Sequence, residues 1–545
     1  MNSLDWSIII IYIAGLLTMS YYLGKKQGDE KDYYLGGNKV HWFPASISVM
    51  ATQLSTNSLL GAPAFVAFSI GGGLLWLQYE LAVPLAMIFV MMFLVPFYKK
   101  SGVISIYEYL NLRFGPATSV MLSALFQFIV AFGTGVTVYG ISLVLQAVLG
   151  IPFWLAVLVL GVVTIIYDTL GGIQGVIASD VIQMFILVSG IFVIGYFAVS
   201  LTGGVASVLE NFDSNRLKAL DFSGHGFGDN STFSFLPMLM GGFFLYVAYY
   251  GCNQTQVQRI LTTKNLDETN KALFLNGLLR FPIVMLYCFM GVAIGAYANL
   301  HPGFIELLPQ KEIIISGTAQ MVPNYNTAVP IFVLEYLPHG IIGIIIVALF
   351  AAAMSSLDST LNSLSAVTIR DIINRFYKQS NHWKPKRRLL MSKGVTVFWG
   401  IIILIFSFLV GDISDSIIVS INKIGSLANG PILGTFLLAI FTKRATDKGT
   451  VIGIIVGFVV NLYLWIFVST ISWMWWNVIG CVVTCTIGYT TSIVFKEYHE
   501  MQLKNLVWKR GIRKDYFKYE KNWNVYYGIL ISYFLLIVVI LYRIS

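Results

Sequence analysis

The sequence predicts an all-α integral membrane protein whose helices cross the bilayer about fourteen times. Apolar residues make up 57% of the 545 residues, charged residues make up only 11%, and the mean hydropathy is +0.76. This composition is typical of a polytopic membrane protein and not of a soluble chain with several domains. Apolar runs of about 18 or more residues recur along the whole chain. We therefore treat residues 1–545 as a single transmembrane domain.

The predicted spans and the basic residues together indicate a topology. The spans cover residues 5–24, 44–69, 74–97, 117–149, 153–169, 178–201, 234–254, 272–299, 340–370, 391–410, 415–441, 449–468, 474–495 and 525–542. Most of the 35 Lys and Arg residues fall in loops 25–39, 98–115, 255–271, 370–393, 442–448 and 496–523. The positive-inside rule places these loops in the cytoplasm and both termini outside. We expect a multi-pass protein of the plasma membrane, in a bacterium the inner membrane.

Several function classes are disfavoured by the same features. The net charge of +9 is explained by topology, so we expect no nucleic-acid partner. The four cysteines lie in apolar segments, which disfavours a disulfide framework or a zinc site. The first span lacks a basic start and a small-residue cleavage site before Lys25, and we read it as a retained helix. We expect no enzyme, because neither a Gly-x-Ser-x-Gly motif nor a metal-spaced His/Cys cluster occurs.

Polar residues interrupt two of the predicted spans. The second span contains the run TQLSTNS at residues 52–58, and the seventh contains YYGCNQ at residues 249–254. These spans begin two successive groups of five, residues 44–201 and residues 234–441. Broken helices at matching positions of two halves are typical of an inverted-repeat transporter with a site near the bilayer midplane. A channel would instead need a continuous pore.

The ninth span carries a polar stripe inside an otherwise apolar helix. Ser355, Asp358, Ser359, Asn362 and Ser363 follow the helical spacing i, i+3, i+4, i+7 and i+8. A carboxylate at membrane depth is costly unless it faces the bundle interior or a water-filled path. The hydroxyl residues alone would also be explained by close helix packing. Oxygen ligands without Cys or His suit a hard cation rather than a transition metal.

With these residues in view, the chain resembles the sodium/solute symporter family over nearly its whole length. The motifs that carry the resemblance are SSLDSTLNS at residues 355–363, DVIQ at 180–183, NQTQVQR at 253–259, SIYEYL at 105–110 and LGG at 170–172. The family includes sodium–galactose, sodium–proline, sodium–sialic acid, iodide and multivitamin symporters. The implied fold is the leucine-transporter type of five-plus-five inverted repeat. One extra helix (5–24) would precede the repeats (44–201 and 234–441), and three helices (449–545) would follow.

The resemblance also implies a sodium site between the first and eighth core helices. Its ligands would be the backbone carbonyls of Ala51, Leu54 and Ala352 and the hydroxyls of Ser355 and Ser356. This agrees with the residues themselves, since an unwound helix frees carbonyl oxygens that can replace part of the hydration shell of an ion.

A second sodium site is implied by residues beside the first. Some family members have an aspartate like Asp180 next to the eighth core helix, and here Asp358 and Ser359 extend the polar stripe. Neither aspartate has a cationic partner at helical spacing, so the pair should either hold a cation or carry a proton. A helix N-cap is the alternative role for Asp180, because it opens a span after Ser179.

The resemblance also implies which residues contact the substrate. Tyr79 and Glu80 look like the sugar-contacting pair of the galactose symporter, and Asn422 and Tyr249 match an amide contact and an inner-gate tyrosine there. Arg280 stands in for a lysine, whereas Asn57, Ser58 and Tyr246 replace residues that contact sugar. Arg280 and Lys423 could attract an anion, and could equally be snorkelling or paired with Glu80.

We expect a sodium-coupled secondary active symporter that imports a small polar solute, for example a sugar, by alternating access. The alternative is a symporter of an organic or inorganic anion of the monocarboxylate, sialic acid or vitamin type. A membrane sensor with a transporter fold is a third interpretation. The expected partners are sodium, the solute and membrane lipid, and we expect a functional monomer.

Overall fold

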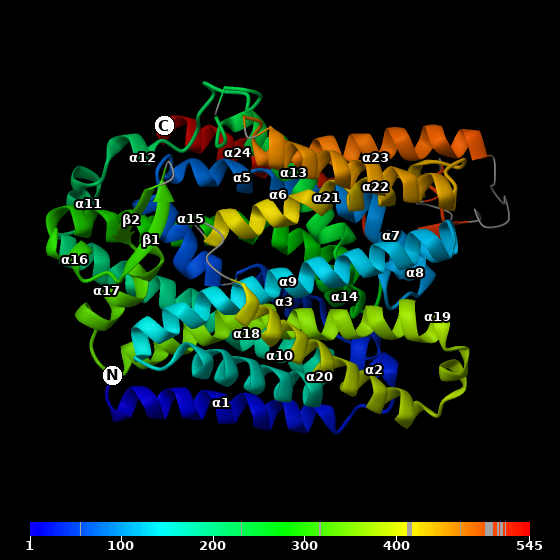
Figure 1. The fold of residues 1–545 in the computed structure, drawn as a ribbon, viewed down its shortest axis with the longest axis horizontal. Helices are drawn as coiled ribbons and strands as arrows, with labels where there is room; N and C mark the ends of the chain where they lie inside the picture. The colour runs from blue at the N-terminus through cyan, green and yellow to red at the C-terminus, as the bar shows by residue number, and fades with distance from the viewer. Residues whose placement is uncertain are drawn as a thin grey trace.

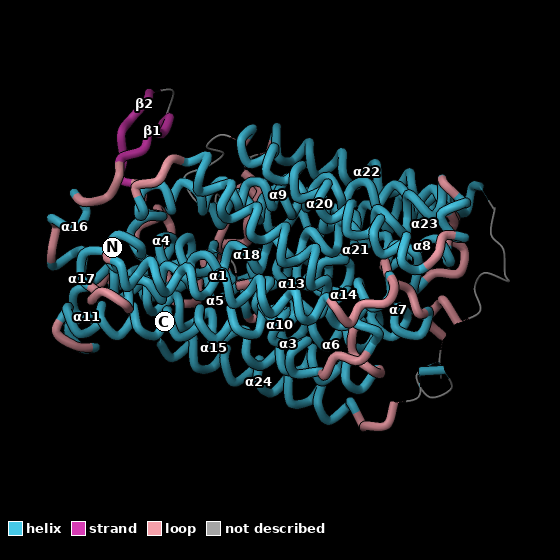
Figure 2. Tube along the Cα trace, turned by 90° about the horizontal axis from the view of Figure 1, so that it is seen from below, coloured by secondary structure: helices cyan, strands magenta, loops and turns pink. Residues whose placement is uncertain are grey.

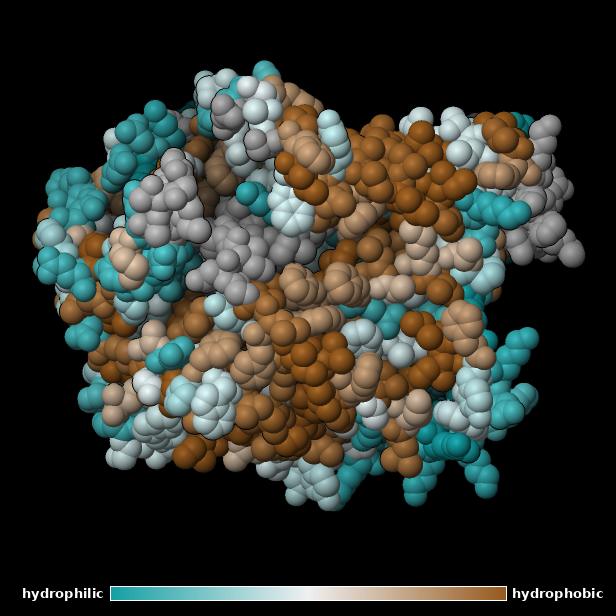
Figure 3. Space-filling model, viewed as in Figure 1, coloured by the Kyte–Doolittle hydropathy of each residue, from teal (hydrophilic) through white to brown (hydrophobic). Residues whose placement is uncertain are grey.

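The structure is a bundle of membrane-length helices. The computed structural model describes residues 1–54, 56–229, 231–315, 318–410, 417–468, 470–495, 505–509, 512, 516–517 and 519–544. The helices run roughly parallel to the long axis of the molecule, and both ends of the chain lie at the same end of the bundle (Figure 1). Apolar residues cover the middle of the visible surface, and hydrophilic residues gather toward the two ends (Figure 3). This surface fits a helical bundle that spans a membrane.

The first half of the chain folds into fourteen α, 3₁₀ or π segments within the described residues. They are α1 (Ser3–Gly24), α2 (Glu30–Leu35), η1 (Gly36–Asn38), α3 (Trp42–Gln53), η2 (Asn57–Gly61), α4 (Ala62–Ala67), η3 (Leu74–Trp76), α5 (Leu77–Glu80), α6 (Ala82–Phe89), η4 (Val90–Leu94), α7 (Val95–Ser101), α8 (Ile106–Arg113), α9 (Pro116–Leu149) and α10 (Phe153–Thr202). The predicted break in the second span is present, because α3 ends at Gln53 and the helical path resumes in η2 and α4.

The second half of the chain adds further helices and one hairpin. They are α11 (Val205–Asn211), α12 (Ser214–Leu217), α13 (Phe235–Cys252), α14 (Gln254–Leu261), α15 (Leu266–Leu300), α16 (Gly303–Glu306), β1 (Gln310–Ile315), β2 (Thr318–Pro323), η5 (Tyr325–Thr327), α17 (Ala328–Tyr336), α18 (Ile341–Val367), η6 (Thr368–Ile373), α19 (Asn374–Phe376), η7 (Lys378–His382), α20 (Pro385–Leu409), α21 (Ile417–Phe441), α22 (Asp447–Phe467), α23 (Trp473–Phe495) and α24 (Trp523–Ile544). The predicted break in the seventh span is also present, since Asn253 separates α13 from α14 with an extended backbone.

Among the described residues, eleven helices are long and apolar enough to cross a membrane. The longest, α10, has 50 residues, which at 1.5 Å per residue would make a straight helix of about 75 Å. That length is more than twice the hydrocarbon core of a bilayer, about 30 Å. A break at Gly172, with φ 54° and ψ −159°, divides α10 where the sequence predicts the boundary between two spans.

Glycine at position 172 is required by both conformation and space. Its positive φ lies in the left-handed region that favours glycine. A Cβ atom there would also lie 2.7 Å from Cδ2 of Tyr33 and 2.9 Å from Nε2 of Gln27. Gln27 Nε2 donates a hydrogen bond to the carbonyl of Gly171 at 2.5 Å. The segment that follows α1 is therefore packed directly on the break in α10.

The sequence did not indicate the β-hairpin. Strands β1 and β2 pair antiparallel, with Gln310 opposite Pro323 and Ile315 opposite Thr318. The hairpin projects beyond the helices at the end of the bundle that holds α16 and α17 (Figure 2). It lies within a stretch whose Gly, Asn and Pro content predicts only a loop.

Helix α1 is joined to α18 by a buried carboxylate. The Asp5 side chain is fully buried and accepts hydrogen bonds from the backbone N–H groups of Gly340 (2.7 Å) and Gly343 (3.0 Å). These groups lie at the N-terminus of α18, where the first N–H groups of a helix have no partner within the helix. His339 Nδ1 lies 3.1 Å from the same carboxylate. Asp5 thus caps α18 from another helix, and its negative charge complements the helix dipole.

Candidate functional site

Oxygen atoms of α3 and α18 meet in the middle of the bundle. The Ser355 hydroxyl lies 3.3 Å from the carbonyl of Ala51 and 3.5 Å from that of Ala352, and the Ser356 hydroxyl lies 3.5 Å from the Ala352 carbonyl. Ala51 belongs to the last turn of α3, whose carbonyls have no helical partner. Leu54 follows directly as the C-terminal cap, with non-helical dihedral angles. The structure therefore brings together the elements that carry all five predicted sodium ligands.

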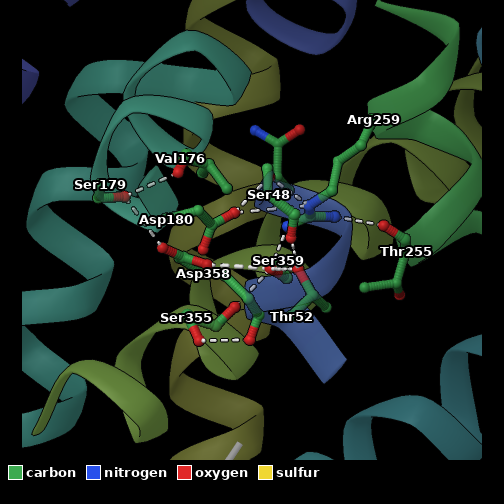
Figure 4. A network of polar contacts seen from close by, with 12 residues as sticks. Ser48, Thr52, Val176, Ser179, Asp180, Thr255, Arg259, Ser355, Asp358 and Ser359 are labelled. Atoms are coloured by element: carbon green, nitrogen blue, oxygen red, sulfur yellow. Dashed lines mark hydrogen bonds and ion pairs between the residues drawn. The ribbon is translucent and has the colours of Figure 1, made fainter. Parts of the chain in front are cut away.

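The second group of predicted ligands is part of a buried polar network (Figure 4). Asp180 Oδ2 accepts a hydrogen bond from Ser48 at 2.5 Å and lies 3.6 Å from Nε of Arg259. The Arg259 side chain is only 1% exposed, and it also donates to Ser48, to Ser359 and to the Thr255 carbonyl. Asp180 thus has a cationic partner, contrary to the expectation drawn from helical spacing. That partner comes from α14, far from α10 in sequence.

The alternative role of Asp180 as a helix N-cap is wrong. Asp180 lies eight residues beyond the break at Gly172, in the helical part of α10, and not at its start. Arg259, which the sequence analysis counted among the basic residues of a cytoplasmic loop, is buried in the bundle. A buried charge needs a paired, hydrogen-bonded partner, and each of these two residues supplies one to the other.

Asp358 lies close to the ion pair, next to Ser359 (Figure 4). The hydroxyl of Tyr167 donates to Asp358 Oδ2 at 2.5 Å, and Ser359 Oγ lies 3.1 Å from Oδ1. Thr52 Oγ1 lies 3.0 Å from Ser359 Oγ, which links the end of α3 to this carboxylate. Asp358 is fully buried. The two aspartates are therefore linked through Arg259, which pairs with Asp180 and donates to Ser359, the neighbour of Asp358.

A cavity of about 280 Å³ opens next to these groups. Six of the eight predicted substrate residues line it, together with the predicted sodium ligand Ser356; they are Ser58, Tyr79, Glu80, Tyr246, Tyr249 and Arg280. The wall is rich in aromatic rings, and the ring centres of Tyr79 and Tyr246 lie 4.7 Å apart. The side chains of Asn57 and Asn422, the other two predicted substrate residues, lie outside the described part of the chain.

Glu80 and Arg280 form a two-pronged ion pair in the cavity wall. Nε and Nη2 of Arg280 each lie 3.0 Å from one oxygen of Glu80. Both side chains are almost fully buried. Of the three roles left open for Arg280, the structure shows the pairing with Glu80. These are the charged residues among the described side chains that line the cavity, so the described wall carries no net charge.

Several site residues were missed by the sequence analysis. Gln53, Trp76 and Tyr287 line the cavity, and Tyr250 donates to the Gln53 amide oxygen from beside it. Tyr167, which holds Asp358, lies in a span without any polar motif of its own. An aromatic residue in an apolar span gives no sequence signal for a binding role, whereas the polar Gln53 lies in the interrupted run and could have been included.

The chain is similar to known sodium-coupled transporters. The family model described as "Sodium:solute symporter family" matches residues 33–457. The sodium/sialic acid symporter NanT of Aliivibrio fischeri is 30% identical over 501 residues, which are 91% of this chain and 94% of that protein. The sodium/sialic acid symporter SiaT of Proteus mirabilis is 30% identical over 507 residues, 92% of this chain and 97% of that protein.

A solved structure is also similar to this fold. It is described as the substrate-bound outward-open state of a Na⁺-coupled sialic acid symporter that reveals a novel Na⁺ site. The two chains superpose with a TM-score of 0.80 at 27% sequence identity. The match covers 92% of this chain and 99% of the other.

Proposed function

Since the chain belongs to the sodium:solute symporter family, we propose that it carries a small neutral polar solute, for example a sugar, inward together with sodium. Sodium-coupled symport itself follows from the family and from the relatives. The observation that supports a neutral solute is the pairing of Arg280 with Glu80 in the cavity wall. A guanidinium that already binds a carboxylate with two hydrogen bonds offers little net charge to an anion.

The lining of the cavity supports the same solute class. Rings such as Trp76 and Tyr79 supply flat apolar faces, while Gln53, Asn253 and Asn429 supply amide donors and acceptors. Ligand sites with an apolar wall and a few polar groups fix orientation through those polar groups. A solute with several hydroxyl groups and apolar C–H faces matches this lining.

An organic anion is the second candidate, and one observation favours it. Nη1 of Arg280 has no hydrogen-bond partner among the described residues, and it is buried at the cavity. An anionic oxygen could accept from this nitrogen without breaking the ion pair with Glu80. The relatives named for sialic acid fit this reading as well.

For the ions, we propose that Ala51, Leu54, Ala352, Ser355 and Ser356 bind one sodium. Asp180, Asp358 and Ser359 would hold a second, with Arg259 neutralising part of the negative charge. The two carboxylates are balanced by one arginine, so a bound cation would lower the cost of their burial. Sodium at the first site would tie α3 to α18 and favour one state of the transporter, since a ligand shifts an equilibrium only by its differential affinity.

The arrangement in the membrane is part of the proposal. We propose a five-plus-five inverted repeat formed by residues 44–201 and 234–441, and fourteen crossings in total. The long α10 would supply two of these crossings. Both termini would face outward from a bacterial inner membrane, and the basic loops would face the cytoplasm. A monomer surrounded by lipid would be the working unit.

Uptake by reconstituted vesicles tests the function. A panel of labelled neutral sugars, sugar acids and short carboxylates would be supplied with an inward sodium gradient, with a potassium gradient as the control. We expect accumulation of a neutral sugar only when sodium is present. Sodium-driven uptake of acids alone would favour the anion candidate, and uptake without sodium would contradict symport.

A further inference from the structure

A third buried carboxylate, Asp168, takes no part in the sites described above. It lies in α10, four residues before the break at Gly172, and its side chain is fully buried. Among the residues that the structure describes, neither of its carboxylate oxygens has a hydrogen-bond partner. The amide nitrogen of its neighbour Asn362 also lacks a partner, while the Asn362 oxygen accepts from Gln258 at 2.7 Å. Asn362 therefore lies next to the Asp168 carboxyl without forming a hydrogen bond of normal geometry to it.

The charged and titratable groups around Asp168 come from α10 itself and from four other helices. They are Tyr33 of α2, Asp180 of α10, Arg259 of α14, Asp358 of α18 and Lys393 of α20. Arg259 is committed to Asp180, Ser48 and Ser359. Two of the other groups are carboxylates, which oppose a further negative charge.

Lys393 and Tyr33 lie near Asp168, at the break in α10. Lys393 Nζ lies 3.4 Å from the carbonyl of Leu170 and 5.8 Å from the ring centre of Tyr33. The Tyr33 hydroxyl is engaged with Thr396 at 3.0 Å. Both residues pack at the break in α10, and Lys393 is partly exposed. Asp168 and Tyr33 are thus fully buried, whereas the neighbouring Lys393 reaches the surface.

An ionised carboxylate without hydrogen bonds is strongly disfavoured in such surroundings. It must either bind a cation or carry a proton. A sodium ion needs several oxygen atoms around it, and no side-chain hydroxyl of the described residues lies within hydrogen-bond distance of Asp168. A proton needs no ligand shell. The neutral carboxyl is therefore the form that fits this position.

We propose that Asp168 binds a proton and releases it when the break in α10 opens to water. Asp168 holds a proton while Tyr33 and Lys393 cover the break. When these side chains move away, water enters, takes the proton and hydrates the carboxylate that remains. Because the covered state binds the proton more tightly, lower pH favours that state and higher pH favours the open one.

Infrared difference spectroscopy of the purified protein tests the site without any transport. The carbonyl band of a protonated carboxyl should be present in the wild type at pH 7 and missing from Asp168→Asn. Asparagine has nearly the shape of the neutral acid, so the variant should fold. Asp371→Asn is the matched control, since Asp371 is also buried but accepts a hydrogen bond from Ser105. It should keep the Asp168 band.

Two results would overturn the assignment. One is a difference spectrum between wild type and Asp168→Asn that lacks the carboxyl band at pH 7. The other is a band that appears only when sodium is removed, because Asp168 would then be a cation ligand. If Asp168→Asn does not fold, Asp168→Glu replaces it, and the proposal requires the band to shift rather than vanish.

Opening of the break supplies a second measurement. Gln27, whose amide is bound to Gly171, would be replaced by cysteine, and its labelling rate would be divided by that of an exposed cysteine at Lys26 at each pH. We expect this ratio to rise with pH in the wild-type background, by at most about tenfold per pH unit for one proton. In the Asp168→Asn background the ratio should stay low and constant. A ratio that rises equally in both backgrounds would exclude Asp168 as the group that responds.

Discussion

Removal of the Glu80 carboxylate tests whether the ion pair with Arg280 stabilises the fold, binds the solute, or does both. In Glu80→Ala the guanidinium stays buried beside the cavity and loses both hydrogen bonds of 3.0 Å. Breaking a buried ion pair in this way costs about 3–5 kcal/mol of stability, because one charge remains uncompensated. The double variant Glu80→Leu with Arg280→Met removes both charges, and such replacements are often neutral or stabilising.

The double variant should regain the stability that Glu80→Ala loses, but it should not regain the affinity for the solute. If the solute bonds to Glu80 and Arg280, each lost hydrogen bond costs about 1–3 kcal/mol. This corresponds to a loss of affinity of about 5- to 150-fold per bond. We therefore expect Glu80→Ala to lose both stability and solute affinity, and the double variant to lose mainly solute affinity.

The measurements are the melting temperature and the dissociation constants of two ligands. Solute affinity would be measured at saturating sodium, and sodium affinity would be measured without solute, where it should change little. Glu108→Ala is the matched control. Glu108 lies 2.9 Å from Arg370 in an ion pair, and neither residue lines the cavity. It should lower stability and leave solute affinity intact.

A double variant that binds solute as tightly as the wild type would refute the reasoning. Glu80 and Arg280 would then stabilise the fold without binding the solute, and the solute would have to contact other parts of the cavity. A Glu80→Ala variant as stable as the wild type would likewise contradict the cost assigned to the unpaired guanidinium.

Three further substitutions test the ion sites and the fold. Ser356→Ala should weaken sodium activation of uptake by more than about tenfold, the equivalent of 1.4 kcal/mol; an unchanged sodium dependence would remove Ser356 from the site. Asp358→Asn should reduce the sodium-to-solute ratio from about two toward one in a reversal-potential assay, and a variant that still couples two ions would place the second site elsewhere. Asp5→Asn should lower the melting temperature, since the hydrogen bonds of a charged group to Gly340 and Gly343 contribute about 1.5–3 kcal/mol each; an unaltered melting curve would show that this carboxylate does not hold α18.

The parts of the site that the sequence predicts are those in which polar residues contrast with an apolar span. The run at residues 52–58 and the stripe from Ser355 to Ser363 stand out in this way, and Thr52 of the run is hydrogen-bonded to Ser359 of the stripe. Glu80 and Arg280 stand out for the same reason. The end of α3 at Gln53 follows from the run, since such residues favour helix ends over helix interiors.

The features of the site that the sequence does not predict depend on contacts between segments far apart in the chain. Arg259 lies near other basic residues, and only its three-dimensional position shows that it pairs with Asp180 and not with a phosphate head group. Tyr167 is one aromatic residue among many in apolar spans, and its bond to Asp358 has no local pattern. The hairpin of β1 and β2 was not predicted because its strands are short and the turn-forming residues around them make the whole stretch resemble a loop.

The cap that Asp5 places on α18 makes helix α1 a reporter of the helix that carries the polar stripe. A dye attached near the start of α1 would follow α18, since Gly343 approaches the backbone of Asp5 so closely that a Cβ atom there would lie 2.8 Å from its Cα. Ser3 is exposed and lies two residues before Asp5. The native thiols Cys252, Cys288 and Cys481 are buried and Cys485 is half-buried, so Ser3→Cys would be the preferred point of attachment. Movements of the helix that carries the polar stripe would then be visible by fluorescence from a position far from sodium and solute.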